Sequence, residues 1–433
     1  MNRILLTFVM LGIFAVQGLS AAPTSAPWLG HVVADRVVTG SSPDNNFELL
    51  RAFYGSARKS IQISVYELEN IFIGEVLEKA LERNVSVEIL LEGGPIPKLA
   101  VSELYIASRL AKRGAKIYFY DLAKGRNKRA FKYFHNKYGI VDGRKVVVGS
   151  ANYGNNGHPI NSTAGNREWE IVIEDEAAAR LFEQAFFHDR SLEDEWVEYG
   201  TQPKYTFSDA DFVPDRAEHR GKYSLALEPV EDYNVAVQTV FAPDNALDID
   251  GAILGTLKSA ERSLSVQQLN FETYWGDKNY NPEREDSPMM KVILAAARAG
   301  RMIRILLNDD FVFRDPAGLT MFFGFQAPLQ SFAHNQIDAK DPRDNRATVD
   351  YLRRLARREN LDVMVRLLNF KRCGLGVLHN KGIIVDGRKT MVGSLNWGES
   401  ALKFNREAGV VVDSRAVAGY YQEAFDYDWY CSR

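Results

Sequence analysis

The sequence predicts an α/β protein made of two pseudo-symmetric halves, each a mixed β-sheet flanked by helices. Strand and helix patterns follow each other in the same order twice along the 433 residues, and such alternation is typical of layered α/β folds. A polar stretch at residues 135–152 also returns at 379–396 with its charged residues, Ser and Asn at the same spacing. The content of 46% hydrophobic and 25% charged residues is that of a globular protein.

The first half contains the clearest alternation of elements. Residues 23–45 are rich in Pro, Ala, Ser and Gly, and we expect them to form a loose entry to the fold. The elements expected after them are a helix from about residue 47, a strand at 60–66, a helix at 73–83, a strand at 85–91, a helix at 101–113 and a strand at 115–120.

The second half repeats this order. Residues 57–63 return as 260–266, and residues 182–189, which follow the first polar stretch, return as 421–428. The expected organisation is a signal peptide at 1–22, the loose entry at 23–45, a first half at 46–198, a linker at 199–235, and a second half at 236–433 with insertions at about 271–290 and 308–346.

Each copy of the polar stretch is expected to form a β-hairpin, because two apolar runs flank an Asp-Gly pair. In the first copy, alternation along the strand places His135 and Lys137 on one face. With Asp142 and Gly143 as the two central turn residues, Ser150 would lie across from His135. The equivalent residues of the second copy are His379, Lys381, Asp386, Gly387 and Ser394. Each hairpin thus gathers groups that suit a phosphate: a cation, hydrogen-bond donors, and an imidazole that can attack or transfer a proton.

The repeated pattern resembles the signature of the phospholipase D superfamily. It reads His-x-Lys, four residues, Asp, then Gly-Ser-x-Asn, and Asn-Arg-Glu at 166–168 and 405–407 matches the downstream Glu of that family. The resemblance covers nearly the whole chain after the leader. It implies one active site between the two facing hairpins, a covalent phosphohistidine intermediate, and neither a metal nor another cofactor.

The resemblance also implies roles for individual residues. His135 is expected to be the nucleophile and His379 the acid that protonates the leaving group and then activates water, although the opposite assignment stays open. The residues expected to hold phosphate oxygens are Lys137, Lys381, Asn152 and Asn396, supported by Ser150 and Ser394. Glu168 and Glu407 would orient the imidazoles, whereas Asp142 and Asp386, at turn positions, are expected to be structural.

The N-terminus predicts export. A cationic start, an apolar run of about a dozen residues and small residues near position 22 are typical of a cleaved signal peptide, and the alternative of a membrane anchor requires a span of roughly 20 apolar residues. We therefore expect a periplasmic or secreted protein. Cys373 and Cys431, the two cysteines of the chain, are either a disulfide or two buried thiols.

Two substrates remain open, a phospholipid headgroup and a nucleic-acid phosphodiester. The aromatic insertion, with Phe322, Phe323, Phe325 and Phe332, is either buried packing under a long loop or a lip that makes transient contact with a membrane surface, and only the second alternative favours lipid. The net charge of −3 points away from nucleic acid. A basic loop favours a nuclease; its residues are Lys124, Arg126, Lys128, Arg129 and Lys132, of which Lys128 and Arg129 are the expected substrate contacts.

Phospholipid is the preferred substrate. Cardiolipin synthesis is a weaker alternative, because those relatives usually carry Gly-Gly or Gly-Thr where this chain has Gly-Ser. A catalytically silent binding module is disfavoured, because neither copy has lost a catalytic position. No obligate protein partner is inferred.

Overall fold

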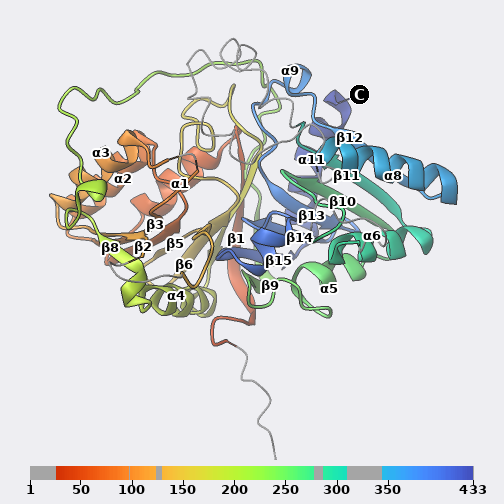
Figure 1. Ribbon diagram of the computed structural model, residues 1–433, viewed down its shortest axis with the longest axis horizontal. Helices are drawn as coiled ribbons and strands as arrows, with labels where there is room; N and C mark the ends of the chain where they lie inside the picture. Colours follow the sequence, from red (N-terminus) through yellow and green to blue (C-terminus); the bar gives the residue numbers. More distant parts are fainter. Residues whose placement is uncertain (1–25, 97, 123–128, 277–285, 310–343, 433) are drawn as a thin grey trace, which may run out of the picture.

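The computed structural model describes residues 26–96, 98–122, 129–276, 286–309 and 344–432. Figure 1 shows the first half in red to yellow and the second in green to blue, with β1 and β9 between them. The first half contains β1 (His31–Ser42), α1 (Asn46–Gly55), β2 (Ser60–Val65), α2 (Ile71–Glu82), β3 (Ser86–Glu92), α3 (Val101–Ala111), β4 (Lys116–Tyr120), β5 (Lys137–Val141), β6 (Lys145–Gly149), β7 (Glu168–Glu174), α4 (Glu176–Arg190) and β8 (Trp196–Glu198).

The second half repeats this order from β9 onward. It contains β9 (Glu231–Ala242), α5 (Ala252–Lys258), β10 (Ser263–Gln268), α6 (Pro288–Arg298), β11 (Met302–Leu307), α8 (Asn345–Glu359), β12 (Val363–Leu367), α9 (Phe370–Cys373), β13 (Lys381–Val385), β14 (Lys389–Gly393), α10 (Glu399–Lys403), β15 (Glu407–Asp413) and α11 (Arg415–Cys431). The helices and strands expected between residues 47 and 120 are therefore confirmed, within a few residues at their ends.

One 15-stranded sheet joins the strands of the described chain, in the order β12-β11-β10-β13-β14-β15-β9-β1-β7-β6-β5-β2-β3-β4-β8. The order is symmetric about the antiparallel pair of β9 and β1, apart from β8 at one edge. In the first half β2, β3 and β4 are parallel, whereas β5, β6 and β7 are antiparallel. The prediction of two pseudo-symmetric halves with mixed sheets is thus confirmed.

The expectation of a loose entry at 23–45 is wrong for residues 31–42. They form β1, which pairs with β7 on one side and with β9 on the other and lies at the centre of the sheet. Its β-branched run includes Val37 and Val38, which are 0% and 9% exposed. The Pro- and Gly-containing flanks hid this run, and pairing with strands more than 100 residues away decided its structure. Likewise, the last residues of the expected linker belong to β9, which begins at Glu231.

Capping residues start the equivalent helices α4 and α11 of the two halves. The side chain of Asp175 accepts a hydrogen bond from the Ala178 N–H at the start of α4, and Ser414 does so from Val417 at the start of α11.

Apolar side chains of the described residues form three cores. Two outer cores lie under α1 to α3 and under α5, α6 and α8, and a shared core under α4 and α11 joins both halves.

The hairpin register differs from the prediction by one residue. Val141 pairs with Lys145, so the turn contains Asp142, Gly143 and Arg144, and extending this register places Asn136 rather than His135 across from Ser150. Asp142 and Gly143 have φ values of 56° and 64°. The Arg144 carbonyl accepts a hydrogen bond from the Asp175 N–H at the start of α4 at 2.9 Å, a contact that favours the third turn residue. The second hairpin has the same three-residue turn.

A disulfide joins Cys373 in α9 to Cys431 at the end of α11, with 5.2 Å between their Cα atoms. Of the two alternatives for these cysteines, the structure therefore contains the bridge. The signal peptide expected at 1–22 lies outside the described residues. Across the described ranges, no helix has the length and apolar character needed to cross a bilayer.

Candidate active site

Two short backbone ladders bring the repeated motifs of the halves together. In the first ladder, residues 132–135 run parallel to 404–407, and the His135 N–H donates to the Arg406 carbonyl at 2.8 Å. In the second ladder, residues 376–379 run parallel to 165–168, and the His379 N–H donates to the Arg167 carbonyl at 3.0 Å. Each His-x-Lys segment is therefore held by the Asn-Arg-Glu segment of the other half.

Each histidine contacts a glutamate from the opposite half. Nδ1 of His135 lies 2.7 Å from Oε2 of Glu407, and Nδ1 of His379 lies 2.7 Å from Oε1 of Glu168. Both imidazoles are 14% exposed, whereas the glutamates are at most 1% exposed. Because a carboxylate engages Nδ1, each ring has a defined orientation with Nε2 as the nitrogen for chemistry. Nε2 of His379 lies 3.3 Å from Nζ of Lys381.

The two motif lysines lie beside these histidines with little access to solvent. Nζ of Lys137 donates to the carbonyl of His135 at 3.0 Å, and Nζ of Lys381 donates to the carbonyl of His379. Both lysines are 1% exposed. Burial lowers the pKa of Lys137 to about 7 and that of Lys381 to about 8, with nearby glutamates opposing the shift. An oxyanion bound between them would restore their charge.

Burial also acts on the histidines. It lowers the pKa of His135 to about 4, against the opposing charge of Glu407, and the two lysines lower it further. The pKa of His379 is lowered for the same reasons. Burial raises the pKa of Glu168, but contacts with His379 outweigh this effect and keep it below its usual value. Burial therefore favours the neutral form of both imidazoles, whereas the contacts with His379 favour the charged form of Glu168.

Comparison with known proteins shows which family has two such motif-containing halves. A family described as "Cardiolipin synthase, PLD-like domain" matches residues 50–190 and 253–429, one segment in each half. The chain belongs to the phospholipase D superfamily. The crystal structure of phosphatidylserine synthase from Haemophilus influenzae Rd KW20 has the same fold, with a TM-score of 0.59 and 13% identity over 93% of this chain and 88% of that one.

Two curated relatives are mitochondrial cardiolipin hydrolases. The protein of Xenopus tropicalis is 39% identical over 54 residues, which is 12% of this chain and 26% of that protein. The protein of Canis lupus familiaris is 26% identical over 191 residues, which is 44% of this chain and 65% of that protein. The chain thus spans less than two thirds of the length of either relative.

The motif serines and asparagines of this superfamily member have different surroundings. Oγ of Ser150 donates to Oε2 of Glu168 at 2.6 Å, and Oγ of Ser394 accepts the Ala408 N–H at 3.0 Å. Both serines are at most 1% exposed, so these hydroxyls hold β7 and β15 in place instead of facing a substrate. Asn152 donates from Nδ2 to Glu67 at 2.8 Å. Its role in phosphate binding, like that of Asn396, stays a prediction.

The expected substrate contact of Arg129 is not supported by its surroundings. Its guanidinium contacts Oε1 of Glu92 at 3.0 Å and Oδ1 of Asp121 at 2.8 Å, so two carboxylates neutralise it. Sequence reasoning overlooked Glu92 because it lies 37 residues away. Lys128, the other expected contact, lies outside the described residues, as do the four insertion phenylalanines.

The turn aspartates bind backbone. Asp142 accepts hydrogen bonds from three consecutive N–H groups at residues 58–60, and Asp386 does so at residues 261–263. These bonds fix the hairpin turns against β2 and β10, at the end of each hairpin opposite to its histidine. Within the part of the chain that the structure describes, no group of three or more His, Cys, Asp or Glu side chains is placed to hold a metal ion.

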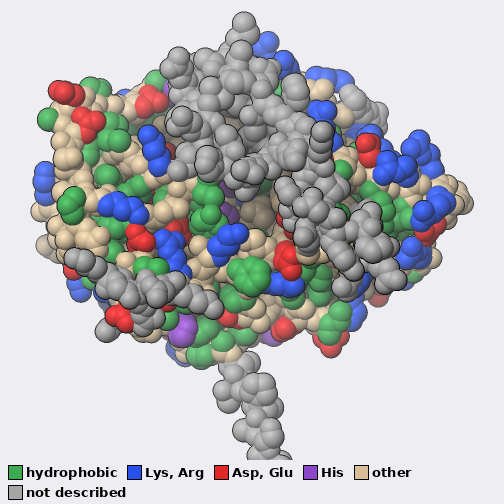
Figure 2. Space-filling view, in the orientation of Figure 1, with side chains coloured by type: hydrophobic (Ala, Val, Ile, Leu, Met, Phe, Trp, Pro, Cys, Tyr) green, Lys and Arg blue, Asp and Glu red, His purple; other side chains and the backbone are tan. Residues whose placement is uncertain are grey.

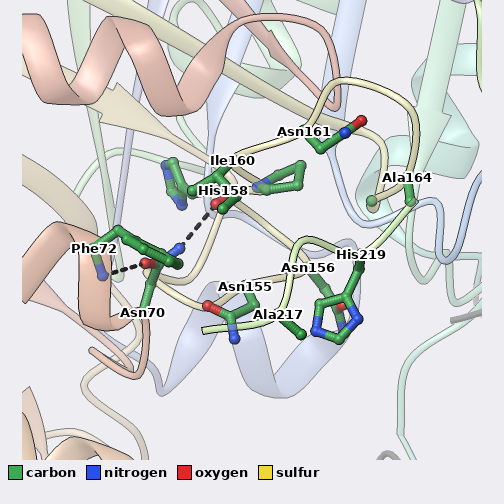
Figure 3. Close-up of a pocket in the computed structure, with 12 residues that line it drawn as sticks. Asn70, Phe72, Asn155, Asn156, His158, Ile160, Asn161, Ala164, Ala217 and His219 are labelled. Carbon is green, nitrogen blue, oxygen red and sulfur yellow. Dashed lines mark hydrogen bonds between the residues drawn. The ribbon is translucent and has the colours of Figure 1, made fainter. Parts of the chain in front are cut away.

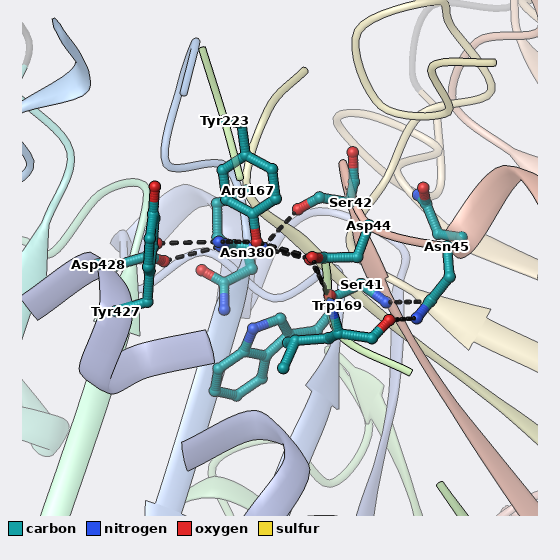
Figure 4. A network of polar contacts seen from close by, with 12 residues as sticks. Ser41, Ser42, Asp44, Asn45, Arg167, Trp169, Tyr223, Asn380, Tyr427 and Asp428 are labelled. Carbon is teal, nitrogen blue, oxygen red and sulfur yellow. Dashed lines mark hydrogen bonds and ion pairs between the residues drawn. The ribbon is translucent and has the colours of Figure 1, made fainter. Parts of the chain in front are cut away.

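Sequence reasoning missed two buried arginines next to the motif glutamates. Arg167 binds Asp428 of α11 through two hydrogen bonds of 2.8 and 2.9 Å and also contacts Asp44 at 3.1 Å (Figure 4). Arg406 binds Asp189 of α4 at 2.9 Å and Asp244 at 2.6 Å. Each arginine thus connects the two halves beside a histidine. The available signal was the arginine of Asn-Arg-Glu, present in both copies.

Glu67 was also missed. It follows β2 by two residues, beside Lys137, and its equivalent in the second half is Asn270. Burial and the charge of Glu69 raise the pKa of Glu67 to about 8, against Lys137 and the bond from Asn152. The first half therefore adds to the site a carboxyl group that the second half lacks.

Proposed function

We propose that the protein is a phosphodiesterase of the phospholipase D type that cleaves a phospholipid through a phosphohistidine intermediate. The observation that carries this proposal is the exchange of glutamates between the halves, which orients His135 and His379 from opposite sides of one interface. Lys137 and Lys381 at the same interface supply charge for the non-bridging phosphate oxygens.

In the first step, Nε2 of His135 attacks phosphorus. An N–P bond forms, the O–P bond to the leaving alcohol breaks, and a proton from protonated His379 passes to the leaving oxygen. His379 must be protonated at the start, and the negative charge of the bound phosphodiester opposes the burial that lowers its pKa.

In the second step, neutral His379 removes a proton from water. The resulting hydroxide attacks phosphorus, the N–P bond breaks, and His135 returns with the phosphomonoester released. If an alcohol replaced water in this step, the phosphatidyl group would be transferred to the alcohol. Such a transfer is the reaction expected of a synthase. Glu407 stabilises the positive charge that develops on His135 during phosphorylation.

A phospholipid substrate is supported by the family description as cardiolipin synthase and by the names of the curated relatives. It is also consistent with the net charge of −3. The competing nuclease function rests on the basic loop. In this loop, two carboxylates already pair with Arg129, which weakens the argument for a contact between Arg129 and nucleic acid.

Export is part of the proposal. The leader-like sequence of residues 1–22 motivates it, and the disulfide between Cys373 and Cys431 supports an oxidising compartment. Mass spectrometry of the protein purified from periplasm or medium should find a new N-terminus near residue 22. Recovery of the full-length chain from the cytosol would contradict export.

The decisive experiment offers the purified protein three substrates in parallel, in the presence of EDTA. These are phosphatidylcholine vesicles, cardiolipin vesicles and single-stranded DNA. We expect phospholipid cleavage, and an acid-labile phosphatidyl group bound to His135 through an N–P bond after rapid quenching. Cleavage of DNA alone would replace the lipid proposal, and a strict need for a divalent ion would contradict the mechanism. Added glycerol or phosphatidylglycerol, followed by product analysis, separates transfer from hydrolysis.

A further inference from the structure

The two ladders that hold the histidines end differently. At the outer end of the first ladder, the Lys132 N–H donates to the Phe404 carbonyl at 2.7 Å. At the equivalent point of the second ladder, the Gly376 N–H donates to the Gly165 carbonyl at 2.8 Å. Each of these residues stands three positions before its motif His or Glu, so the pseudo-symmetry relates a lysine and a phenylalanine to two glycines.

The glycine end is tightly packed at the ladder itself, although a pocket lies beside it. A Cβ on Gly165 would lie 2.9 Å from Cγ of Pro159 and 3.1 Å from Cβ of Pro43, so a side chain has no room. The Tyr223 N–H, from the connection between the halves, donates to the Thr163 carbonyl at 3.0 Å and covers this side. A pocket at this end is lined by residues of the same loop and connection, among them Asn156, His158, Ala164 and His219 (Figure 3).

The lysine end is open. Phe404 is 54% exposed, and Lys132 and Lys403 are exposed beside it. Nζ of Lys132 donates to Oγ of Ser400 at 3.0 Å, and Nζ of Lys403 lies 5.0 Å from the centre of the Trp275 ring. The space-filling view shows apolar and basic side chains around the histidine atoms at the middle of the face (Figure 2). An exposed aromatic ring flanked by ammonium groups is typical of proteins that contact lipid interfaces.

We propose that Lys132, Lys403 and Phe404, here named the outer lip, contact the surface of a bilayer that contains anionic lipid. This inference rests on the proposed lipid substrate. In an extended chain, three residues cover about 10 Å, so the outer lip and His135 lie about that far apart on one ladder. Insertion of Phe404 below the headgroups would present a lipid phosphate at the open end of the site.

The composition of the outer lip favours lipid over single-stranded nucleic acid. Nucleic acid needs a row of cations that follows its backbone, whereas the lip has two lysines, and Lys403 contacts Glu399 at 2.9 Å. Two cations and one apolar ring suit the combined electrostatic and apolar attraction of an anionic bilayer.

The test measures binding to sedimented vesicles of phosphatidylcholine with 30% phosphatidylglycerol, roughly a physiological anionic fraction. We expect Phe404→Ser to weaken binding roughly tenfold, and Lys132→Gln and Lys403→Gln to weaken it about fivefold each, with smaller effects at high salt. Phe187→Ser on α4, where the ring is 52% exposed, and Lys112→Gln at the end of α3 are the matched controls. A soluble short-chain phosphodiester measures whether the variants keep an intact active site.

The outcomes separate this inference from the proposed function. Loss of vesicle binding in Phe404→Ser, with controls unaffected and soluble-ester turnover within about twofold of wild type, supports the outer lip. If Phe404→Ser binds vesicles like wild type, or Phe187→Ser loses as much, the lip proposal is wrong even when phospholipid is cleaved. If the wild type cleaves no lipid but binds vesicles through Phe404, the proposed function fails and the lip stands. Binding of each variant to single-stranded DNA is measured in parallel. If Phe404→Ser loses DNA binding but keeps vesicle binding, the lip proposal is wrong and nucleic acid is the favoured ligand.

Discussion

The two halves carry the same catalytic residues in different surroundings. Each supplies a histidine, a lysine and a glutamate that reaches across the interface. Beside the first hairpin, however, Glu67 occupies the place that Asn270 holds in the second half. The outer end of the first ladder is exposed at Phe404, whereas the equivalent Gly165 is enclosed.

This comparison separates what the reaction needs from what the substrate needs. In the proposed mechanism, nucleophile and acid are both imidazoles held by a carboxylate and a nearby lysine, so symmetry would serve both steps. A phosphodiester has two different ends, and a symmetric site could not distinguish them. We infer that the asymmetric features around the symmetric centre decide which histidine acts as the nucleophile of the proposed mechanism.

The largest expected effect comes from breaking the symmetric centre. His135→Ala and His379→Ala should each lower turnover by about 10⁴-fold or more, and the double variant should be little worse, because the two groups act as a unit. Steady-state kinetics on the preferred lipid checks this. The exposed His31→Ala variant is the control. A His379→Ala protein close to full activity would refute the shared site.

Substitution of the two motif glutamates tests which histidine is the nucleophile and which is the acid. Glu407→Gln and Glu168→Gln should each lower turnover about 10²- to 10⁴-fold, because each carboxylate positions the histidine of the other half. With a nitrophenyl phosphodiester, whose leaving group needs no acid, Glu168→Gln should accumulate phosphohistidine and Glu407→Gln should form it slowly. The reverse pattern would exchange the roles of the two histidines.

Removal of a buried arginine should damage stability. Arg167→Met leaves Asp428 and Asp44 without their cation, and Arg406→Met does the same to Asp189 and Asp244. Loss of one partner of a buried ion pair costs about 3–5 kcal/mol. Denaturant unfolding checks this, with Arg51→Met at an exposed ion pair as a control expected to change by less than about 1 kcal/mol. Equal stability of Arg51→Met and Arg167→Met would contradict the structural role.

The lysines predict a pH dependence of anion binding. Burial lowers their pKa values to about 7 and about 8, so both are charged below pH 7 and lose charge as the pH rises. The affinity for tungstate, a phosphate mimic, should therefore fall above pH 7, by up to about tenfold per pH unit for each lysine. Calorimetry between pH 6 and 9 measures this. Affinity that rises with pH would exclude cationic lysines as the binding groups.

The smallest effect tests the difference between the halves. Glu67→Gln removes a carboxyl group whose charge raises the pKa of Lys137. The decline in tungstate affinity should then begin at lower pH, by up to about one unit, with turnover reduced only about three- to tenfold. Asn270→Ala, at the equivalent position, is the matched control and should not move the profile. Identical profiles for Glu67→Gln and wild type would remove Glu67 from the site.

Sequence by itself determined the duplicated architecture, the hairpins and the catalytic residue types. These features depend on spacing within some 30 residues, such as His135 to Glu168, and local pattern records such spacing directly. The turn length escaped prediction by one residue, because the extra residue is held by a contact with Asp175 at the start of α4.

Only the tertiary structure decided which groups meet. His135 and Glu407 are 272 residues apart, and pairing within each half would have satisfied the same motif. β1 became the centre of the sheet because β7 and β9 cover both its edges, although the Pro- and Gly-containing flanks of its Val-rich run suggested a loop. Arg129 contacts Glu92 and Asp121, which local sequence did not predict, and its contact with a substrate stays a prediction. A buried charged group pairs with an oppositely charged group that the fold places within contact distance. Packing decides which group that is, and local sequence does not encode this packing.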